Sequence, residues 1–288
     1  MSVNSVKIKV FEAFAGYGSQ AMALNRLREN YPQFDYEVVG ISEIDKYALQ
    51  AYQAVHGHCP NYGDISKIDW NTVPDFDLLT YSFPCTDISN AGQQKGLSKA
   101  SGTRSSLLWE CQRAIEIKRP KYLLMENVSA LLSQKFLPDF KEWRNILGEL
   151  GYSSFTQILN ATQFGVPQNR ERVFMVSILG DCQYHFPAPF KLTKRLKDVL
   201  EPVVDEKYYL SDKVISGFDA HLERMQERGN GFGWQPTTGG GIAKAILTES
   251  GNRPCDNYII DKLNTKEKKS HHTKVSIGTI PKISSEDF

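Results

Sequence analysis

The chain has 288 residues, which is enough for one large domain or two ordinary ones. Lysine and arginine together number 34 and aspartate and glutamate 33, so the formal net charge of +1 excludes a histone-like or polybasic protein. Hydrophobic residues make up 41% of the chain and aromatic residues 11%, which excludes global disorder.

The composition also predicts the compartment. The N-terminus lacks a secretory pattern, and no apolar run approaches the ~20 residues of a membrane span. The five cysteines are odd in number and none forms a Cys-x-x-Cys pair, which argues against a disulfide framework or a zinc site. We expect a soluble, cytoplasmic protein without a metal.

Strand-like and helix-like segments alternate up to residue 184. Short apolar runs predict buried strands at residues 7–14, 36–42, 76–81, 121–125 and 172–178. Helical patterns follow two of these strands, at residues 20–29 and 46–55. Apolar strands with helices between them indicate βαβ crossovers, so we predict an α/β domain over residues 1–184 with a doubly wound, mostly parallel sheet.

The character of the sequence changes at residue 185. Prolines and a polar stretch come first, and the chain then becomes glycine-rich and irregular. We predict a second, smaller and loop-rich domain over residues 185–288. Because recognition residues tend to lie on loops carried by a scaffold, we assign these residues to a target-recognition region that is incomplete at its C-terminus.

A glycine-containing turn follows the first predicted strand. Gly16 and Gly18 let the backbone pass close to a ligand, and the next helix points free N–H groups toward it. Glu43 closes the second strand, where nucleotide-binding folds place a carboxylate on ribose hydroxyls, and Asp64 follows in GDIS. A full GxGxxG motif is missing, which favours a nucleoside cofactor without phosphates. The alternative is an ordinary strand–helix turn with capping acids.

Reactive side chains follow the later predicted strands. Cys85 comes after the third strand, Glu126 lies at the end of the fourth, and Arg170 and Arg172 lie at the start of the fifth. Open α/β sheets bind ligands at the carboxyl ends of their strands, so these side chains are candidates for one site. Taken singly, the cysteine is more often a buried apolar residue and the charged residues a surface ion pair.

Taken together, these motifs resemble the DNA cytosine carbon-5 methyltransferases. The matching stretches run from residue 10 to residue 180 in the order and spacing of that family. They are FEAFAGYGS, SEIDKYA, GDIS, SFPC, AGQQKGL with GTRSSLLWE, MENV and FGVPQNRERVF.

The resemblance implies S-adenosylmethionine as methyl donor and an S-adenosylmethionine-dependent methyltransferase type of sheet. It implies that Glu43 binds the ribose and Asp64 the adenine, and that Ile44 takes the place of a larger side chain against the adenine. The other residues implied at the cofactor are Phe14, Gly16, Gly18, Pro84 and Leu107.

The resemblance also implies the chemistry. Cytosine carbon 5 is a poor nucleophile until a group adds at carbon 6, and the thiolate of Cys85 is the implied nucleophile. Glu126 would contact ring nitrogen 3 and the amino group, while Arg172 and Arg170 would hold the exocyclic oxygen. Attack is perpendicular to the ring, so the target base must be flipped out of the duplex.

The chain departs from the family pattern in two places. Thr86 replaces the usual glutamine after the cysteine, which we expect to affect closure of the loop 86–96 more than bond making. Residues 185–288 contain neither of the two motifs with which the family normally ends. We therefore expect either a chain cut short within or just after target recognition, or one half of a two-chain enzyme whose partner chain completes the fold. His56, His58 and Cys59 offer metal ligands, but an ordinary helix end is the favoured interpretation.

The predicted function is methylation of cytosine in a specific double-stranded DNA sequence, in a prokaryotic restriction–modification or phage setting. Arg228, Trp234, Thr237 and Thr238 lie in the glycine-rich segment 228–241 and are candidates to face a DNA groove, with a flexible connector as the alternative. Competing functions are methylation of cytosine in RNA and an inactive relative that binds DNA or cofactor without turnover. The further alternative, a nicotinamide-dependent oxidoreductase, is supported only by the GxG pattern.

Overall fold

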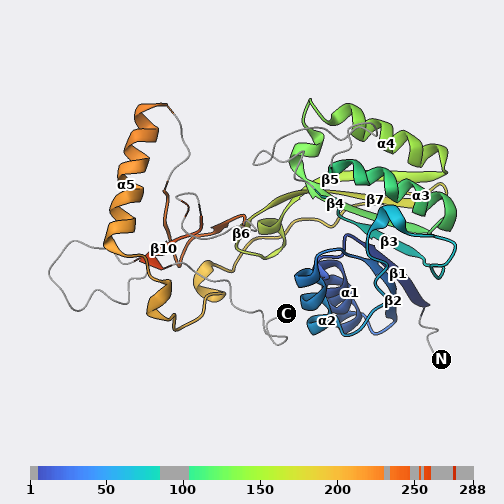
Figure 1. The fold of residues 1–288 in the computed structure, drawn as a ribbon, viewed down its shortest axis with the longest axis horizontal. Helices are drawn as coiled ribbons and strands as arrows, with labels where there is room; N and C mark the ends of the chain where they lie inside the picture. Colours follow the sequence, from blue (N-terminus) through green and yellow to red (C-terminus); the bar gives the residue numbers. More distant parts are fainter. Residues whose placement is uncertain are drawn as a thin grey trace. The chain divides into compact units, whose positions relative to one another are not determined.

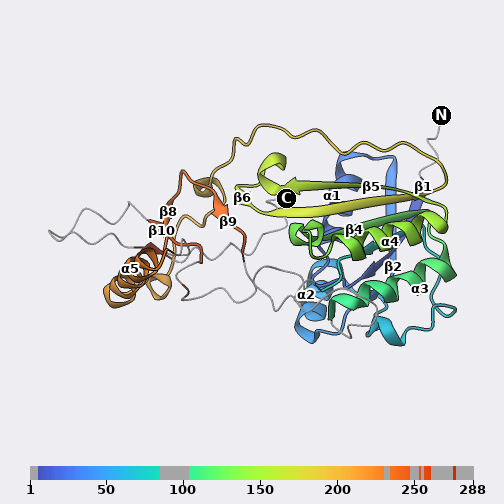
Figure 2. The ribbon, with the colours of Figure 1, turned by 90° about the horizontal axis from the view of Figure 1, so that it is seen from above.

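The structure is a computed structural model that describes residues 6–84, 104–229, 234–246, 253, 256–260 and 275–276. It divides into two compact units, which Figures 1 and 2 show. The first contains Met1–Leu159 and Glu171–Pro187, and the second contains Asn160–Arg170 and Ala188–Phe288. The assignment of residues 185–288 to target recognition remains a prediction.

The first unit is built on a six-stranded sheet of order β2-β1-β3-β4-β7-β5. Its strands are β1 (Val6–Ala13), β2 (Phe34–Ser42), β3 (Leu78–Tyr81), β4 (Tyr122–Val128), β5 (Tyr152–Asn160) and β7 (Glu171–Leu179). β1 pairs in parallel with β2 and β3, and β3 with β4, whereas β7 is antiparallel to β4. The predicted α/β fold with a mostly parallel sheet is confirmed.

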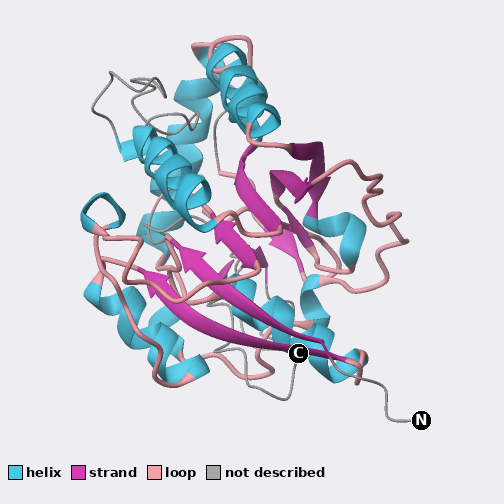
Figure 3. Cartoon of the chain, turned by 90° about the vertical axis from the view of Figure 1, so that its right-hand side faces the viewer, coloured by secondary structure: helices cyan, strands magenta, loops and turns pink. Residues whose placement is uncertain are grey.

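Helices cover both faces of this sheet (Figure 3). They are α1 (Ser19–Asn30), α2 (Lys46–His56), α3 (Leu108–Lys118) and α4 (Leu137–Glu149), with 3₁₀ turns η1 (Ile65–Lys67), η3 (Arg104–Leu107) and η4 (Ser129–Leu132). Successive residues of β1 point to opposite faces: Val10 packs with Leu24 of α1, while Phe11 belongs to the core that contains α3 and α4. Both residues are fully buried, as expected for a sheet covered on both sides.

The strand directions determine where a site can form. Because β1, β2, β3 and β4 are mutually parallel, the segments that follow them emerge at one edge of the sheet. β7 runs the opposite way, so its first residues, Glu171 and Arg172, lie at that same edge, opposite the end of β4.

The second unit contains one long helix, α5 (Asp212–Glu227), which lies beside β8 and β10 (Figure 2). Its strands are β6 (Gln168–Asn169), β8 (Thr237–Thr238), β9 (Ala243–Lys244), β10 (Ile259–Ile260) and β11 (Val275–Ser276), and its 3₁₀ turns are η5 (Ala161–Phe164), η6 (Leu196–Asp198) and η7 (Glu206–Tyr208). β10 joins β8 and β11, and β6 pairs with β9.

A small aromatic core holds α5 to the short strands of the second unit. The ring of Trp234 lies 5.1 Å from that of Phe218 and 4.9 Å from that of Tyr258. Trp234 is only 6% exposed. The prediction that Trp234 faces a DNA groove is therefore wrong. Burial of its large apolar ring stabilises this unit, and that stabilisation would be lost if the ring faced solvent.

Candidate active site

The turn after β1 is shaped by two glycines with different roles. Gly16 has φ +58°, and a Cβ added there would meet no atom of the described chain within 4 Å, so the space beside it is open to a ligand. Gly18, the N-cap of α1, has φ +85°, and its Cβ would fall 2.7 Å from Cε2 of Tyr52 and closer still to the ring of His56. The positive φ disfavours a side chain at both positions, and close packing also excludes one at Gly18.

Glu43 holds this turn in place from the end of β2. Its Oε2 accepts a hydrogen bond from the Gly16 N–H at 2.8 Å, and its Oε1 accepts one from the Asp45 N–H at 2.7 Å. Each carboxylate oxygen can accept a further bond, so the group retains capacity for hydroxyl donors. Phe14, which precedes the turn, has φ +58°, a strained value for a residue with a side chain.

Ile44 follows Glu43 and is strongly solvent-exposed, at 77%. A branched apolar side chain in water next to a fixed carboxylate can provide an apolar surface for a flat ring. The sequence predicts it at the adenine, and its placement beside Glu43 is compatible with that role.

Asp64 caps a short 3₁₀ turn. Its Oδ1 accepts hydrogen bonds from Ser66 N at 3.1 Å and Ser66 Oγ at 2.8 Å, and Lys67 Nζ lies 3.6 Å from Oδ2. The Ser66 side chain and backbone, followed by the charge of Lys67, hold the pKa of the Asp64 carboxyl below its ordinary value. The carboxylate is thus charged and oriented, and its predicted contact with adenine remains a prediction.

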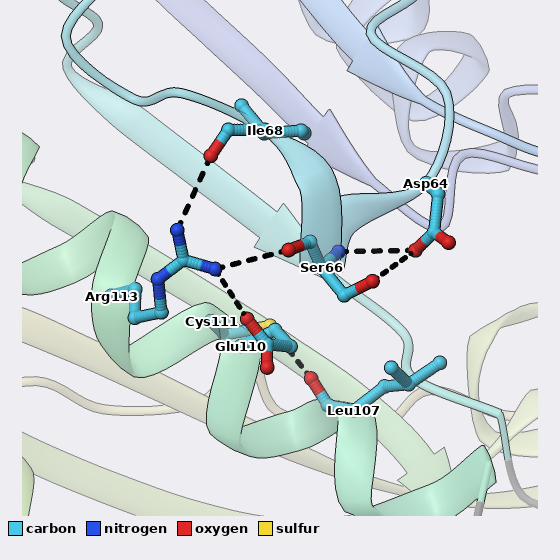
Figure 4. A network of polar contacts seen from close by, with 7 residues as sticks. All are labelled: Asp64, Ser66, Ile68, Leu107, Glu110, Cys111 and Arg113. Atoms are coloured by element: carbon cyan, nitrogen blue, oxygen red, sulfur yellow. Dashed lines mark hydrogen bonds and ion pairs between the residues drawn. The ribbon is translucent and has the colours of Figure 1, made fainter.

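Arg113 joins the Asp64 turn to α3, as Figure 4 shows. Its guanidinium donates to the carbonyl oxygens of Ser66 and Ile68, both at 3.3 Å, and lies 2.8 Å from Glu110 Oε2. Leu107, predicted to line the cofactor, immediately precedes α3 and is half-buried. The network therefore holds together two elements that carry predicted cofactor residues, and sequence reasoning did not identify Arg113.

Glu126 and Arg172 form an ion pair across β4 and β7. Arg172 Nε lies 2.9 Å from Glu126 Oε1, with the two side chains 20% and 24% exposed. Val128 is the direct partner of Arg172 in the ladder, so the ion pair is a diagonal one on the same face of the sheet. A carboxylate and a guanidinium side by side can bind a ligand edge that carries both a donor and an acceptor.

Hydrogen bonds fix the segment 82–84, which leads from β3 to Cys85. Asn127 Nδ2 donates to Phe83 O at 3.0 Å, and Ser105 Oγ donates to Pro84 O at 2.7 Å. Asn127 is 2% exposed and Ser105 is fully buried. The structure thus brings Pro84 close to η3, while Cys85 itself lies outside the described residues.

Arg170 belongs to the second unit, where its carbonyl oxygen accepts a hydrogen bond from Ala161 N at 3.0 Å. A cavity of about 590 Å³ lies in the same unit, and its lining carries the cations Arg195 and Lys244. Within the described residues, Lys244 forms no ion pair, and half-buried Arg195 donates to the carbonyl oxygens of Leu192 and Lys194. The remaining lining residues are Thr162, Gln163, Asn169, Phe190, Leu192, Ile242 and Ala243.

The histidine and cysteine at the end of α2 and just after it make contacts within the fold. His56 Nε2 lies 3.2 Å from Tyr17 O, and burial lowers the pKa of His56 despite its backbone contacts. Cys59 is buried near Tyr52. Over the part of the chain that the structure describes, no three His, Cys, Asp or Glu side chains are grouped to hold a metal. In that same part, none of the helices is long and apolar enough to cross a membrane.

The sequence matches a family model and several known proteins. The family model of the C-5 cytosine-specific DNA methylases matches residues 8–286. The type II methyltransferase M2.ScrFI of Lactococcus lactis subsp. cremoris is 41% identical over 263 residues, which cover 73% of this chain and 72% of that protein. The orphan methyltransferase M.SssI of Spiroplasma monobiae is 36% identical over 267 residues, covering 72% of this chain and 68% of that protein.

The fold is also found among solved structures. The crystal structure of the S. pombe Dnmt2 methyltransferase superposes with a TM-score of 0.66 at 19% sequence identity. The superposition covers 91% of this chain and 78% of that one. At this level of identity the similarity establishes the shared fold.

Proposed function

Because the chain belongs to the C-5 cytosine-specific DNA methylase family, we propose that it methylates carbon 5 of a flipped-out cytosine in a specific double-stranded DNA sequence, with S-adenosylmethionine as donor and a covalent adduct of Cys85 as intermediate. The observation that carries the proposal is the Glu126–Arg172 pair at the edge of the sheet where the segment leading to Cys85 also emerges. These are the residues to which the family's motifs assign the reaction.

The turn after β1 fits the proposed cofactor. Gly16 leaves space beside the backbone, Glu43 can accept hydroxyl donors, and exposed Ile44 can cover one face of a purine. S-adenosylmethionine, when bound, supplies an electrophilic methyl group attached to a sulfonium. In this proposal Glu43 orients the ribose and Asp64 the adenine, and Leu107 and Pro84 close the pocket wall.

The base is activated by the chain's own side chains. The Cys85 thiolate forms a bond to carbon 6, and the electron pair of the 5,6 double bond becomes available at carbon 5 for methylation. Glu126 contacts ring nitrogen 3 and the amino group, and Arg172 holds the exocyclic oxygen as charge builds up during attack. A contact of Arg170 with the same oxygen remains a prediction. Removal of the proton from carbon 5 then restores the double bond and releases the cysteine.

DNA binding falls in part to the second unit. Its cavity offers the ammonium of Lys244 and the half-buried Arg195 beside the exposed ring of Phe190, which suits a phosphate and its attached sugar or base. Flipping the target base costs a few kcal/mol, and phosphate contacts of this kind would help offset that cost. The expected partner chain remains a prediction.

Transfer of a labelled methyl group into plasmid DNA tests the proposal. We expect incorporation by the wild-type chain and none by Cys85→Ser. Cys182→Ser is the matched control, because Cys182 is a free, half-buried cysteine in the last part of the first unit. Labelling by Cys85→Ser at the wild-type rate, or no labelling by any variant even with a polypeptide carrying the family's C-terminal motifs, would contradict the proposal.

A further inference from the structure

The residues that precede Cys85 are held by side chains from separate elements. Asn127 of β4 bonds Phe83 O, and Ser105 of η3 bonds Pro84 O. A further bond reaches the first residue of the segment: Gln20 Nε2 of α1 donates to Ser82 Oγ at 2.9 Å. Each of the residues 82–84 therefore has its own anchor.

The anchor from Gln20 differs in kind from the other anchors. Asn127 and Ser105 bind backbone carbonyls, which any residue at positions 83 and 84 would present. The bond from Gln20 to Ser82 joins two side chains that are 62 residues apart in the sequence, so it requires both residue types. A substitution that removes either side chain therefore disconnects Ser82, the first residue of the segment, from α1.

The amide of Gln20 is itself oriented. Ser19 Oγ donates to Gln20 Oε1 at 3.0 Å, which leaves Nε2 directed to Ser82. Gln20 lies in the first turn of α1, two residues beyond Gly18. The bond therefore connects the helix that begins at the cofactor turn with the segment that leads to the nucleophile.

We propose that Gln20 is a positioning residue that, through Ser82, fixes the segment 82–84 and thereby the placement of Cys85 for attack on carbon 6. The inference rests on the proposed role of Cys85 as nucleophile. Covalent attack depends steeply on the position of the attacking atom, and a displacement of about 1 Å can cost a factor of about 100 in rate. In this proposal Gln20 acts through Ser82 and takes no part in bond making.

The first test separates turnover from binding. We expect Gln20→Met and Ser82→Ala each to lower kcat about five-fold, the size of one lost neutral hydrogen bond, with little change in KM for DNA or S-adenosylmethionine. The double variant is expected to match the single ones, because both changes remove the same bond. Ser82→Thr keeps the hydroxyl and is expected to retain activity.

The matched control is Gln112→Met on α3. Gln112 also donates a side-chain hydrogen bond from a helix, to Glu116 Oε1 at 2.7 Å, but its partner lies in the same helix and not in the segment before Cys85. We expect wild-type kcat for this control. Loss of activity in Gln112→Met equal to that in Gln20→Met would show a general effect of removing a helix glutamine and would overturn the proposal.

A second readout does not depend on turnover. The rate at which iodoacetamide alkylates Cys85 in the free chain, read peptide by peptide with Cys182 as internal reference, should change at least two-fold in Gln20→Met and Ser82→Ala at unchanged melting temperature. Unchanged alkylation and unchanged kcat in both variants would overturn the role of Gln20. Failure of the wild-type chain to methylate DNA would instead count against the proposed function, and the alkylation rates would still decide the role of Gln20.

Discussion

Arg172 Nε lies 2.9 Å from Glu126 Oε1, and each side chain is less than a quarter exposed. The partners lie on antiparallel strands, at the end of β4 and the beginning of β7. Ion pairs that are exposed to solvent contribute little to stability. The Glu126–Arg172 pair is largely shielded from solvent, and it lies at the edge where parallel sheets bind their ligands. Its geometry is better explained by ligand binding than by surface stabilisation.

The first prediction concerns this pair. Arg172→Lys keeps the charge but loses the planar donors, and Glu126→Gln keeps the shape but loses the charge. We expect either change to lower kcat by a factor of about 100, because each removes an interaction with charge that develops during attack. Single-turnover methylation measures this effect. Wild-type rates in both variants would show that the pair is structural.

The second prediction distinguishes the two glycines of the turn after β1, where we propose that the cofactor binds. Gly16→Ala adds a methyl group to open space at φ +58°, so we expect a backbone cost of about 1–2 kcal/mol and a marked loss of cofactor affinity. Gly18→Ala adds a clash with Tyr52 and His56, which costs about 1–3 kcal/mol more. Thermal unfolding and calorimetric titration with S-adenosylhomocysteine measure both effects. Equal destabilisation by the two substitutions would contradict this account.

The third prediction follows from Glu12, the penultimate residue of β1, whose carboxyl is fully buried. Burial raises its pKa to about 6 from 4.5, although the Tyr52 hydroxyl donates to its Oε2 at 2.6 Å. A raised pKa favours the folded state below pH 4.5, and this contribution is lost as the pH rises through 6. The shift corresponds to about 2 kcal/mol.

Glu12→Gln keeps the shape and the acceptor oxygen but cannot ionise. We therefore expect the variant to gain about 2 kcal/mol over wild type at pH 7.5 and to match it near the unperturbed pKa of 4.5. Urea unfolding at the two pH values provides the measurement. A difference between variant and wild type that is independent of pH would refute the buried-acid interpretation.

The fourth prediction concerns the cavity of the second unit. If Lys244 contacts a DNA phosphate, Lys244→Gln reduces the slope of log K against log salt concentration by about 0.9. Lys207→Gln is the control, because Lys207 already pairs with Asp205 at 3.0 Å in the same unit. Fluorescence anisotropy over a salt series measures both slopes. An unchanged slope in Lys244→Gln would place the DNA backbone elsewhere.

The apolar strands of the first unit were predictable because burial on both faces leaves an uninterrupted apolar run. Residues 172–178 were recognised in this way as the strand that the structure bounds at Glu171–Leu179. Its antiparallel direction was not, since a buried strand has the same pattern in either direction. β5 (Tyr152–Asn160) escaped prediction because most of its residues are half-buried or exposed and several are polar.

Sequence patterns could not predict the long-range contacts. The bond between Gln20 and Ser82 depends on how α1 packs beside β3, which no local spacing encodes. Trp234 was misassigned because an aromatic residue in a glycine-rich segment resembles a ligand contact, whereas its ring partners come from α5 and from Tyr258. The edge on which Glu126 lies was predictable, since it follows from the direction of a parallel strand, whereas Arg172 reaches that edge only because β7 is antiparallel.

The covalent role of Cys85 is tested most directly with duplex DNA that carries 5-fluorocytosine at the target position. Fluorine at carbon 5 cannot leave as a proton does, so the adduct between the Cys85 sulfur and carbon 6 cannot resolve after methyl transfer. We predict a complex of the wild-type chain and DNA that survives denaturing electrophoresis, with the modified peptide containing Cys85. A wild-type chain that methylates ordinary DNA but forms no such complex would contradict the mechanism.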